Sequence, residues 1–275
     1  MSIFTACERN EPIIPDFQKD QPSRIMRDVS YGSDTLQKMD VHLPQGRNPA
    51  STRSIVLIHG GGWNSGSKSD FVTYIDSFKR RMPEYAIFNL NYRLFNGGHR
   101  FPAQEEDVKK AIDFIIKHAA EYGVSKDGLV LLGASAGGHL ALLQAYKYRQ
   151  PAVKAVIDFF GPTDLVSMYR KPWHPFVTFA LEMVTGTNPA VDPDLYRESS
   201  PVYFIDRQSP PTLIFHGAKD AVVNLSQSKA LEAALDKAGV KNELVVYPNA
   251  AHGWYGTTLS HSFDRIEHFL RANVK

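Results

Sequence analysis

The sequence predicts one α/β domain built on a mostly parallel, doubly wound sheet. Two observations predict it: short runs that are apolar on both faces, and helical stripes between them. A parallel sheet covered by helices on both sides needs strands of that kind. The 275 residues, 43% hydrophobic and 22% charged, are within the size and composition of a single globular domain.

The strands and helices of this sheet can be assigned in chain order. Six β-branched and aromatic runs are predicted strands: residues 54–59, 85–90, 129–133, 155–160, 212–216 and 243–247. Residues 107–122 and 225–238 carry apolar side chains at helical spacing and are predicted helices. Strand and helix therefore alternate, as a doubly wound sheet requires.

Three further segments complete the predicted organisation. Residues 25–31 and 36–43 flank a turn-prone stretch and predict an antiparallel hairpin at the sheet edge. Residues 1–24 are predicted to be a tail, and the domain is expected to span 25–275. Residues 162–201 depart from the strand and helix rhythm and are a candidate cap insertion over the site.

Composition narrows the classes of partner. Lysine and arginine number 31 against 29 acidic residues, so a formal charge of +2 predicts no binding of nucleic acid. The single cysteine, Cys7, forms no internal disulfide and makes no thiolate metal site alone. Apolar runs stay below the roughly 18 residues that predict a membrane-spanning helix.

The N-terminus permits two interpretations. Small residues before Cys7 are typical of the end of a lipoprotein signal, but only six residues precede it, fewer than export needs. The sequence therefore favours a cytoplasmic protein with a disordered tail. The alternative is an exported lipoprotein with a truncated signal and lipid on Cys7.

Residues 133–137 spell GASAG, a GxSxG pattern, between a predicted strand and a helical stretch. This context fits a sharp strand-to-helix turn that exposes a nucleophilic serine, Ser135. Glycines two residues to either side leave room for the chain and a substrate to approach. The following helix N-terminus presents free amides to developing negative charge.

A second pattern, HGGGW, occupies residues 59–63 at the end of another predicted strand. Glycine loops of this kind donate backbone amides to an oxyanion, and such a donor is worth about 3 to 4 kcal/mol of transition-state stabilisation. His59 is expected to anchor this loop by hydrogen bonds. The two patterns together indicate acyl transfer more strongly than either alone.

A nucleophilic serine needs a base and an orienting carboxylate, which follow it in the chain as Asp and then His in this fold. Asp220 and His252 each follow a predicted strand in the C-terminal third, where open α/β sheets place their sites. His261 and His268 lie on the predicted last helix, where a surface role is usual.

Three other residues are weaker candidates. Asp164 is an alternative acid that comes early in the chain order, and Asp158 lies within a strand. His139 follows the serine turn on its helix and is expected to pack in the interior.

Six segments carry a resemblance to a known family: HGGGWNSGSK (59–68), NYRL (91–94), FPAQEEDVKKAI (101–112), GASAGGHLALL (133–143), HGAKDAVV (216–223) and AAHGW (250–254). In this order they resemble the hormone-sensitive-lipase-like carboxylesterases of the α/β-hydrolase fold, nearest the small bacterial acetyl-xylan or feruloyl esterases. The resemblance covers residues 27–275.

The resemblance implies a role for each matching residue. Ser135 would be the nucleophile, His252 the base and Asp220 the orienting acid. The oxyanion donors would be Gly61, Gly62 and Ala136. Asp107 resembles a structural acid of the family, and its place near a helix N-terminus fits stabilisation by the helix dipole.

The predicted function is that of a serine esterase acting on a small-molecule ester through an acyl-enzyme, with no metal or organic cofactor. Acetyl to butyryl esters are the expected substrates, with acetyl or feruloyl esters of carbohydrate as one possibility. Alternatives are an amidase or formamidase of the kynurenine-formamidase type and a non-catalytic binding protein.

Substrate contacts are expected from the glycine loop and the cap. Trp63 ends the HGGGW pattern, and Tyr169, Trp173 and His174 are expected to form an ordered wall beside Ser135. Phe176, Phe179 and Met183 fall at helical spacing, which equally predicts a helix packed on the sheet.

Overall fold

The computed structural model describes residues 21–96, 98–148 and 151–274. Within these residues, eight strands form one mixed sheet in the order β1-β2-β4-β3-β5-β6-β7-β8. Their bounds are β1 Arg24–Ser30, β2 Lys38–Leu43, β3 Ser54–Ile58, β4 Ala86–Leu90, β5 Leu129–Ala134, β6 Val153–Phe159, β7 Thr212–Gly217 and β8 Asn242–Tyr247. β1 and β2 pair antiparallel, as β2 and β4 do, and every later pairing is parallel.

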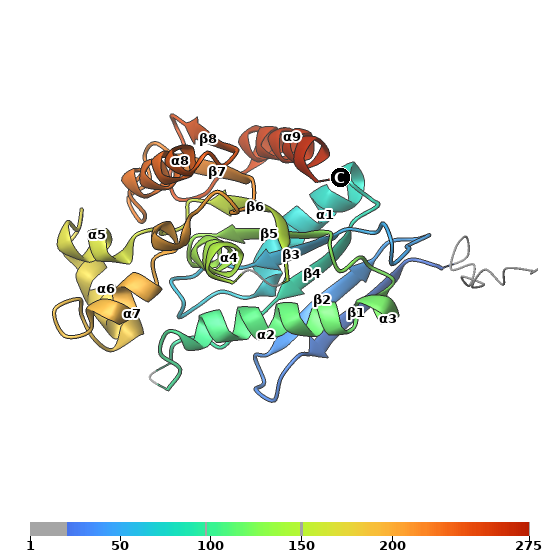
Figure 1. Cartoon of the computed structure of the whole chain (residues 1–275), viewed down its shortest axis with the longest axis horizontal. Helices are drawn as coiled ribbons and strands as arrows, with labels where there is room; N and C mark the ends of the chain where they lie inside the picture. The colour runs from blue at the N-terminus through green and yellow to red at the C-terminus, as the bar shows by residue number, and fades with distance from the viewer. Residues whose placement is uncertain (1–20, 97, 149–150, 275) are drawn as a thin grey trace, which may run out of the picture.

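Helices cover both faces of the sheet (Figure 1). Their bounds are α1 Val72–Arg81, α2 Ala103–Lys117, α3 Ala119–Tyr122, α4 Ala136–Lys147, α5 Leu165–Arg170, α6 Phe176–Thr185, α7 Pro193–Glu198, α8 Ser226–Ala238 and α9 Gly256–Asn273, with short 3-10 turns at Lys68–Phe71 and Pro201–Phe204. One core contains α2, α4 and α8, and the other contains α1 and α9.

The alternation of side chains in β3 explains how one strand serves two cores. Ile55 and Leu57 are buried beneath α1 and α9, whereas Val56 and Ile58 point into the opposite core. Every residue of this strand is buried. The continuous apolar run of residues 55–58 is therefore what this place in the sheet demands.

The predicted fold is confirmed in its main features. The six predicted strands are present within one or two residues, and the predicted hairpin is the antiparallel pair β1 and β2. The helix expected over residues 107–122 begins earlier, at Ala103, and is interrupted at His118 before α3. The domain start predicted at residue 25 lies one residue inside β1.

The segment 162–201 contains α5, α6 and α7, which lie together at one end of the sheet in Figure 1. No helix in the part of the chain that the structure describes has the length and apolarity to cross a membrane. Cys7 and residues 1–20 lie outside the described residues. The predictions about the tail, lipid attachment and localisation therefore stay predictions.

Candidate active site

Ser135 stands at the sharp turn between β5 and α4, with φ 54° and ψ −121°. A non-glycine residue with positive φ is strained and persists only where its surroundings hold it. Its amide donates to the carbonyl of Phe159 at 2.8 Å. A Cβ on Gly133 would lie 2.1 Å from the carbonyl oxygen of Gly137, and one on Gly137 would lie 1.9 Å from that of Ile58. The turn thus admits only glycine at these two positions.

His252 connects the serine to a carboxylate. It lies in the loop after β8, and its Nε2 is 3.0 Å from Ser135 Oγ. Its Nδ1 is 2.7 Å from Asp220 Oδ2. Because a carboxylate only accepts, Nδ1 carries the proton and Nε2 presents its lone pair to the serine hydroxyl. This geometry lets the imidazole take a proton from that hydroxyl.

Asp220 lies after β7, and its side chain is fully buried. Its Oδ1 accepts from the amides of Val222 and Val223 at 2.8 and 2.9 Å. Burial alone would raise the pKa of this carboxyl, but hydrogen bonds from His216 and His252 and from the Val223 amide hold it well below its ordinary value. Asp220 is thus held as a carboxylate facing the imidazole.

The glycine loop turns back on itself through positive φ angles of 104° at Gly61, 58° at Gly62 and 61° at Trp63. His59 anchors its base: the ring stacks on Tyr92 at 4.3 Å between centroids, and Nδ1 is 2.8 Å from the Gly60 carbonyl. The left-handed backbone at Gly61 and Gly62 favours glycine, since a Cβ there would be strained.

A cavity of about 300 Å³ opens beside Ser135. Its described lining comes from the glycine loop, the serine turn, the cap and the loop after β7: Gly61, Gly62, Trp63, Asn64, Ser65, Ser135, Ala136, Pro162, Met168, Phe176, Val177, Ala180, Leu181, Met183, Val184, Val222 and Val223. The cap contributes apolar side chains almost throughout. The cavity therefore offers an apolar chamber with its reactive hydroxyl at one wall.

Of the residues predicted to contact substrate, only some line this cavity. Trp63 is part of the described lining, whereas Tyr169, Trp173 and His174 are not. The Tyr169 hydroxyl donates to Glu182, the Trp173 indole donates to the Ala221 carbonyl, and the exposed His174 accepts from the Phe176 amide. Their polar groups are thus engaged by the cap and by the loop that follows β7.

The aromatic side chains of α6 do not pack against the sheet, which was the alternative prediction for this helix. Phe176 is 61% exposed and Phe179 55% exposed, whereas Leu181 and Val184 are buried. Sequence reasoning missed Leu181 and Val184, which line the cavity. Their only signal was apolarity within an irregular segment, which does not distinguish a pocket wall from a core.

The remaining candidates have other surroundings. His261 and His268 are exposed on α9, as expected. Asp164 caps α5 by accepting from the Ser167 amide at 2.9 Å. Asp158 is fully buried beneath the serine turn; burial raises its pKa to about 7, although the nearby His216 and the Gly161 amide lower it.

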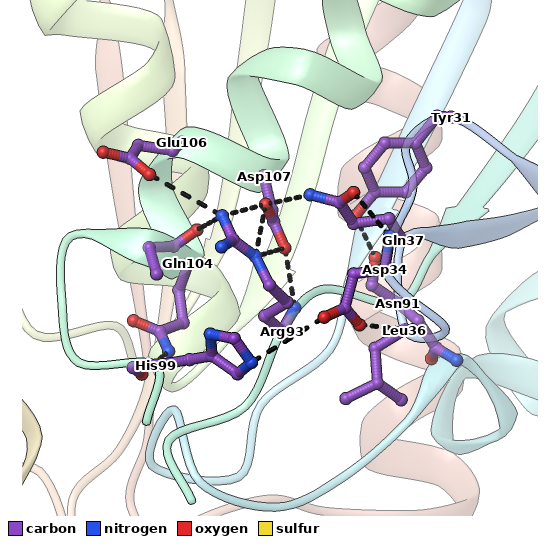
Figure 2. A network of polar contacts seen from close by, with 11 residues as sticks. Tyr31, Asp34, Leu36, Gln37, Asn91, Arg93, His99, Gln104, Glu106 and Asp107 are labelled. Atoms are coloured by element: carbon purple, nitrogen blue, oxygen red, sulfur yellow. Dashed lines mark hydrogen bonds and ion pairs between the residues drawn. The ribbon is translucent and has the colours of Figure 1, made fainter. Parts of the chain in front are cut away.

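Asp107 has structural contacts, as the resemblance implies, but the helix dipole does not explain its place. It is the fifth residue of α2, beyond the first turn in which the helix dipole acts. Its buried carboxylate instead accepts from Arg93 Nη2 at 2.7 Å, from the Arg93 amide at 2.8 Å and from Gln37 Nε2 at 2.6 Å (Figure 2). Asp107 therefore ties the segment after β4 to α2 and to the loop between β1 and β2.

Comparisons with known proteins identify the family of this chain. A family model described as BD-FAE matches residues 39–235. The chain is 26% identical to the esterase LipC of Mycobacterium tuberculosis over 83% of this chain and 59% of that protein. It spans only about 50 to 60% of the length of the first curated relatives.

Solved structures similar in fold include esterases. A structure described as a truncated carbohydrate esterase from gut microbiota is 25% identical, with a TM-score of 0.76 over 90% of this chain and 97% of that one. A propionate-bound esterase of Thermogutta terrifontis is 26% identical, with a TM-score of 0.73 over 94% and 96%. These neighbours confirm the α/β-hydrolase fold, and the homologues are carboxylic ester hydrolases.

Proposed function

Since this chain belongs to the BD-FAE family, we propose that it is a serine carboxylesterase that cleaves short-chain carboxylic esters through an acyl-enzyme. In this proposal Ser135 is the nucleophile, His252 the general base and Asp220 the carboxylate that orients it. The observation that carries the proposal is the continuous chain of hydrogen bonds from the Ser135 hydroxyl through His252 to Asp220, at 3.0 and 2.7 Å.

The first half of the reaction forms the acyl-enzyme. His252 Nε2 takes the hydroxyl proton as Ser135 Oγ attacks the ester carbonyl, and the carbonyl oxygen becomes an oxyanion. The amides of Gly61, Gly62 and Ala136 are proposed to bind that oxyanion, a role supported by their place around the cavity with Ser135. The tetrahedral intermediate collapses, and the alcohol leaves with the proton from His252.

The second half restores the enzyme. Water enters the site, His252 takes its proton, and the hydroxide adds to the acyl carbon. The intermediate then expels Ser135 Oγ, which regains its proton from His252 as the acid product departs. Asp220 stays ionised throughout and stabilises the imidazolium that forms twice in each cycle, a role supported by its lowered pKa.

The substrate class follows from the size and surface of the cavity. A volume of about 300 Å³ is at the low end of ligand pockets. The apolar wall favours an acyl group without charge, from acetyl to butyryl. A neighbour described as a carbohydrate esterase supports a carbohydrate as the carrier of the ester, and we propose an acetyl or feruloyl group as its acyl part.

Turnover of 4-nitrophenyl esters from two to twelve carbons tests this proposal. Each methylene that fits should gain up to about 0.8 kcal/mol, and kcat/KM should fall steeply beyond roughly six carbons. A preference for ten or twelve carbons would contradict the short-chain proposal. Matched anilides would identify an amidase, which uses the same residues, if they were cleaved as fast as the esters.

A further inference from the structure

His139 occupies a junction between three parts of the molecule that surround the cavity. It lies on α4, fully buried, and its amide donates to the Ser135 carbonyl at 3.0 Å. Its Nδ1 is 3.2 Å from the indole Nε1 of Trp63, and its Nε2 is 2.7 Å from the carbonyl of Ser199, at the end of the cap. One imidazole thus touches the nucleophile helix, the glycine loop and the cap.

The partners fix the protonation of this ring. A carbonyl only accepts, so Nε2 carries the proton and donates to Ser199. An indole N–H only donates, so Nδ1 is the bare nitrogen that accepts from Trp63. Burial lowers the pKa of His139 to about 4, which keeps the ring in this neutral form near neutral pH.

The hydrogen bond from the indole to His139 would fix the position of Trp63. It follows Gly61 and Gly62 directly, adopts a left-handed φ of 61° and lines the cavity. Its carbonyl accepts from the Phe95 amide at 2.7 Å, so the backbone is held on one side and the ring on the other. A shift of this residue would move both the cavity wall and the neighbouring glycine amides.

We propose that His139 is a positioning residue that holds the Trp63 ring between the nucleophile helix and the cap, and thereby sets the acyl selectivity of the site. The proposal rests on the proposed esterase function. His139 acts through Trp63 and does not touch the substrate. Its loss should therefore change the ratio between substrates, and a residue needed only for folding would lower stability and leave that ratio unchanged.

A double-mutant cycle measures this contact in activity. His139→Leu removes both ring bonds, and Trp63→Phe keeps an aromatic ring but removes the indole donor. Each should lower kcat/KM for 4-nitrophenyl butyrate about tenfold and the acetate value less, because small misplacements near a reacting centre are costly. In the double variant, kcat/KM for 4-nitrophenyl butyrate should be less than about twofold below that of the less active single variant. Full additivity, or unchanged butyrate-to-acetate ratios in both single variants, would overturn the proposal.

Two further variants separate this contact from general damage. His139→Gln offers one amide oxygen and one amide nitrogen, so it should restore at least about a third of wild-type kcat/KM. His268→Leu replaces an exposed histidine on α9 and should match the wild type. If His139→Leu does not fold, failure of His139→Gln to restore the butyrate-to-acetate ratio contradicts the proposal by itself.

Hydrogen exchange of the Trp63 indole proton tests the same contact without any substrate. The resonance is assigned by its disappearance in Trp63→Phe, and it should exchange only about threefold faster in His139→Gln than in the wild type, because the amide oxygen of glutamine still accepts from the indole. In His139→Leu the increase should be larger still. Equal exchange in all forms would overturn the proposal. A wild type that cleaves no ester would refute the proposed function, while this measurement would still decide whether His139 holds Trp63.

Discussion

The proposed catalytic end of the sheet, which carries Ser135, and the cap meet at one cavity but are built differently. At the catalytic end, Ser135, His252 and Asp220 are fixed by hydrogen bonds of 2.7 to 3.0 Å and by a strained turn. In the cap, α6 presents Phe176 at 61% exposure, and the side chains with which it lines the cavity, such as the buried Leu181 and Val184, are apolar. Polar geometry thus positions the chemistry, and apolar packing shapes what the chemistry acts on.

That difference separates the expected effects of mutation. The hydrogen-bonded groups at the proposed catalytic end can act in only one geometry, so their loss should lower kcat/KM for every ester by a similar factor. Apolar side chains of the cap can repack, so their replacement should change the preference between esters more than the overall rate.

The largest effect is expected from His252. His252→Ala removes the base and leaves Asp220 without its imidazole partner, so turnover of 4-nitrophenyl acetate should fall at least about 10³-fold. Initial rates at matched enzyme concentration, with circular dichroism as a folding check, give the result. His261→Ala, on the exposed face of α9, is the control and should keep wild-type rates. A loss below about tenfold in His252→Ala would assign the base elsewhere.

Asp107 joins α2 to the segment after β4 and to the loop between β1 and β2, and its replacement should lower the free energy of unfolding most. Asp107→Ala leaves Arg93 without its buried partner, so the free energy of unfolding should drop by about 3 kcal/mol. Denaturation in urea measures the drop. Asp113→Ala breaks an exposed pair with Lys109 and should cost less than about 1 kcal/mol. Equal losses in the two variants would refute the role assigned to Asp107.

The cap should control selectivity. Val184→Phe places an aromatic ring where a buried valine lines the cavity, so kcat/KM for butyrate should fall about tenfold and that for acetate about twofold. The matched control is Val191→Phe, in the same segment but 75% exposed, which should leave both values unchanged. If Val184→Phe lowers both esters equally, the cavity is not the acyl site.

The stability of the protein should depend on pH because Asp158 is a buried acid beneath the serine turn. Because the folded-state pKa of Asp158, about 7, exceeds its ordinary value of 3.8, folded protein holds a proton that unfolded protein releases between these pH values. The free energy of unfolding contributed by this group therefore falls as pH rises from about 4 to 7. Asp158→Asn should gain stability relative to wild type over that window and keep the gain above it. Urea melts at pH 4.5, 6 and 8 measure this, and a constant difference would contradict it.

The smallest effect is expected at Trp173. Its indole donates to the Ala221 carbonyl, and the residue is not part of the described cavity lining. Trp173→Ala should therefore change kcat/KM for 4-nitrophenyl acetate and feruloate less than about threefold. A tenfold loss confined to feruloate would support the prediction that this aromatic wall binds substrate.

The sequence located the strands and the polar site because each leaves a local pattern. An apolar run predicts a covered strand, and GxSxG and HGGGW carry backbone requirements that glycine alone meets at Gly133, Gly137 and Gly61. Asp220 and His252 followed from chain order and strand ends. These residues could be predicted because their chemistry restricts which amino acids can serve.

The cap could not be predicted in the same way. Aromatic residues such as Trp173 attract attention in a sequence, yet the described cavity wall also uses Leu181 and Val184, which any core would accept. The partners of Asp107 could not be predicted either, since Arg93 and Gln37 come from distant segments. Contacts of this kind depend on tertiary packing, which leaves no periodic signal.

Labelling with a fluorophosphonate tests the central claim most directly, because the reagent reacts with an activated serine and mimics the tetrahedral intermediate. Intact wild-type protein should gain one adduct, and peptide mass spectrometry should place it on Ser135. The adduct should be absent in Ser135→Ala and form far more slowly in His252→Ala. An unlabelled wild type, or an adduct on another serine with turnover retained in Ser135→Ala, would contradict the assignment of Ser135 as the nucleophile.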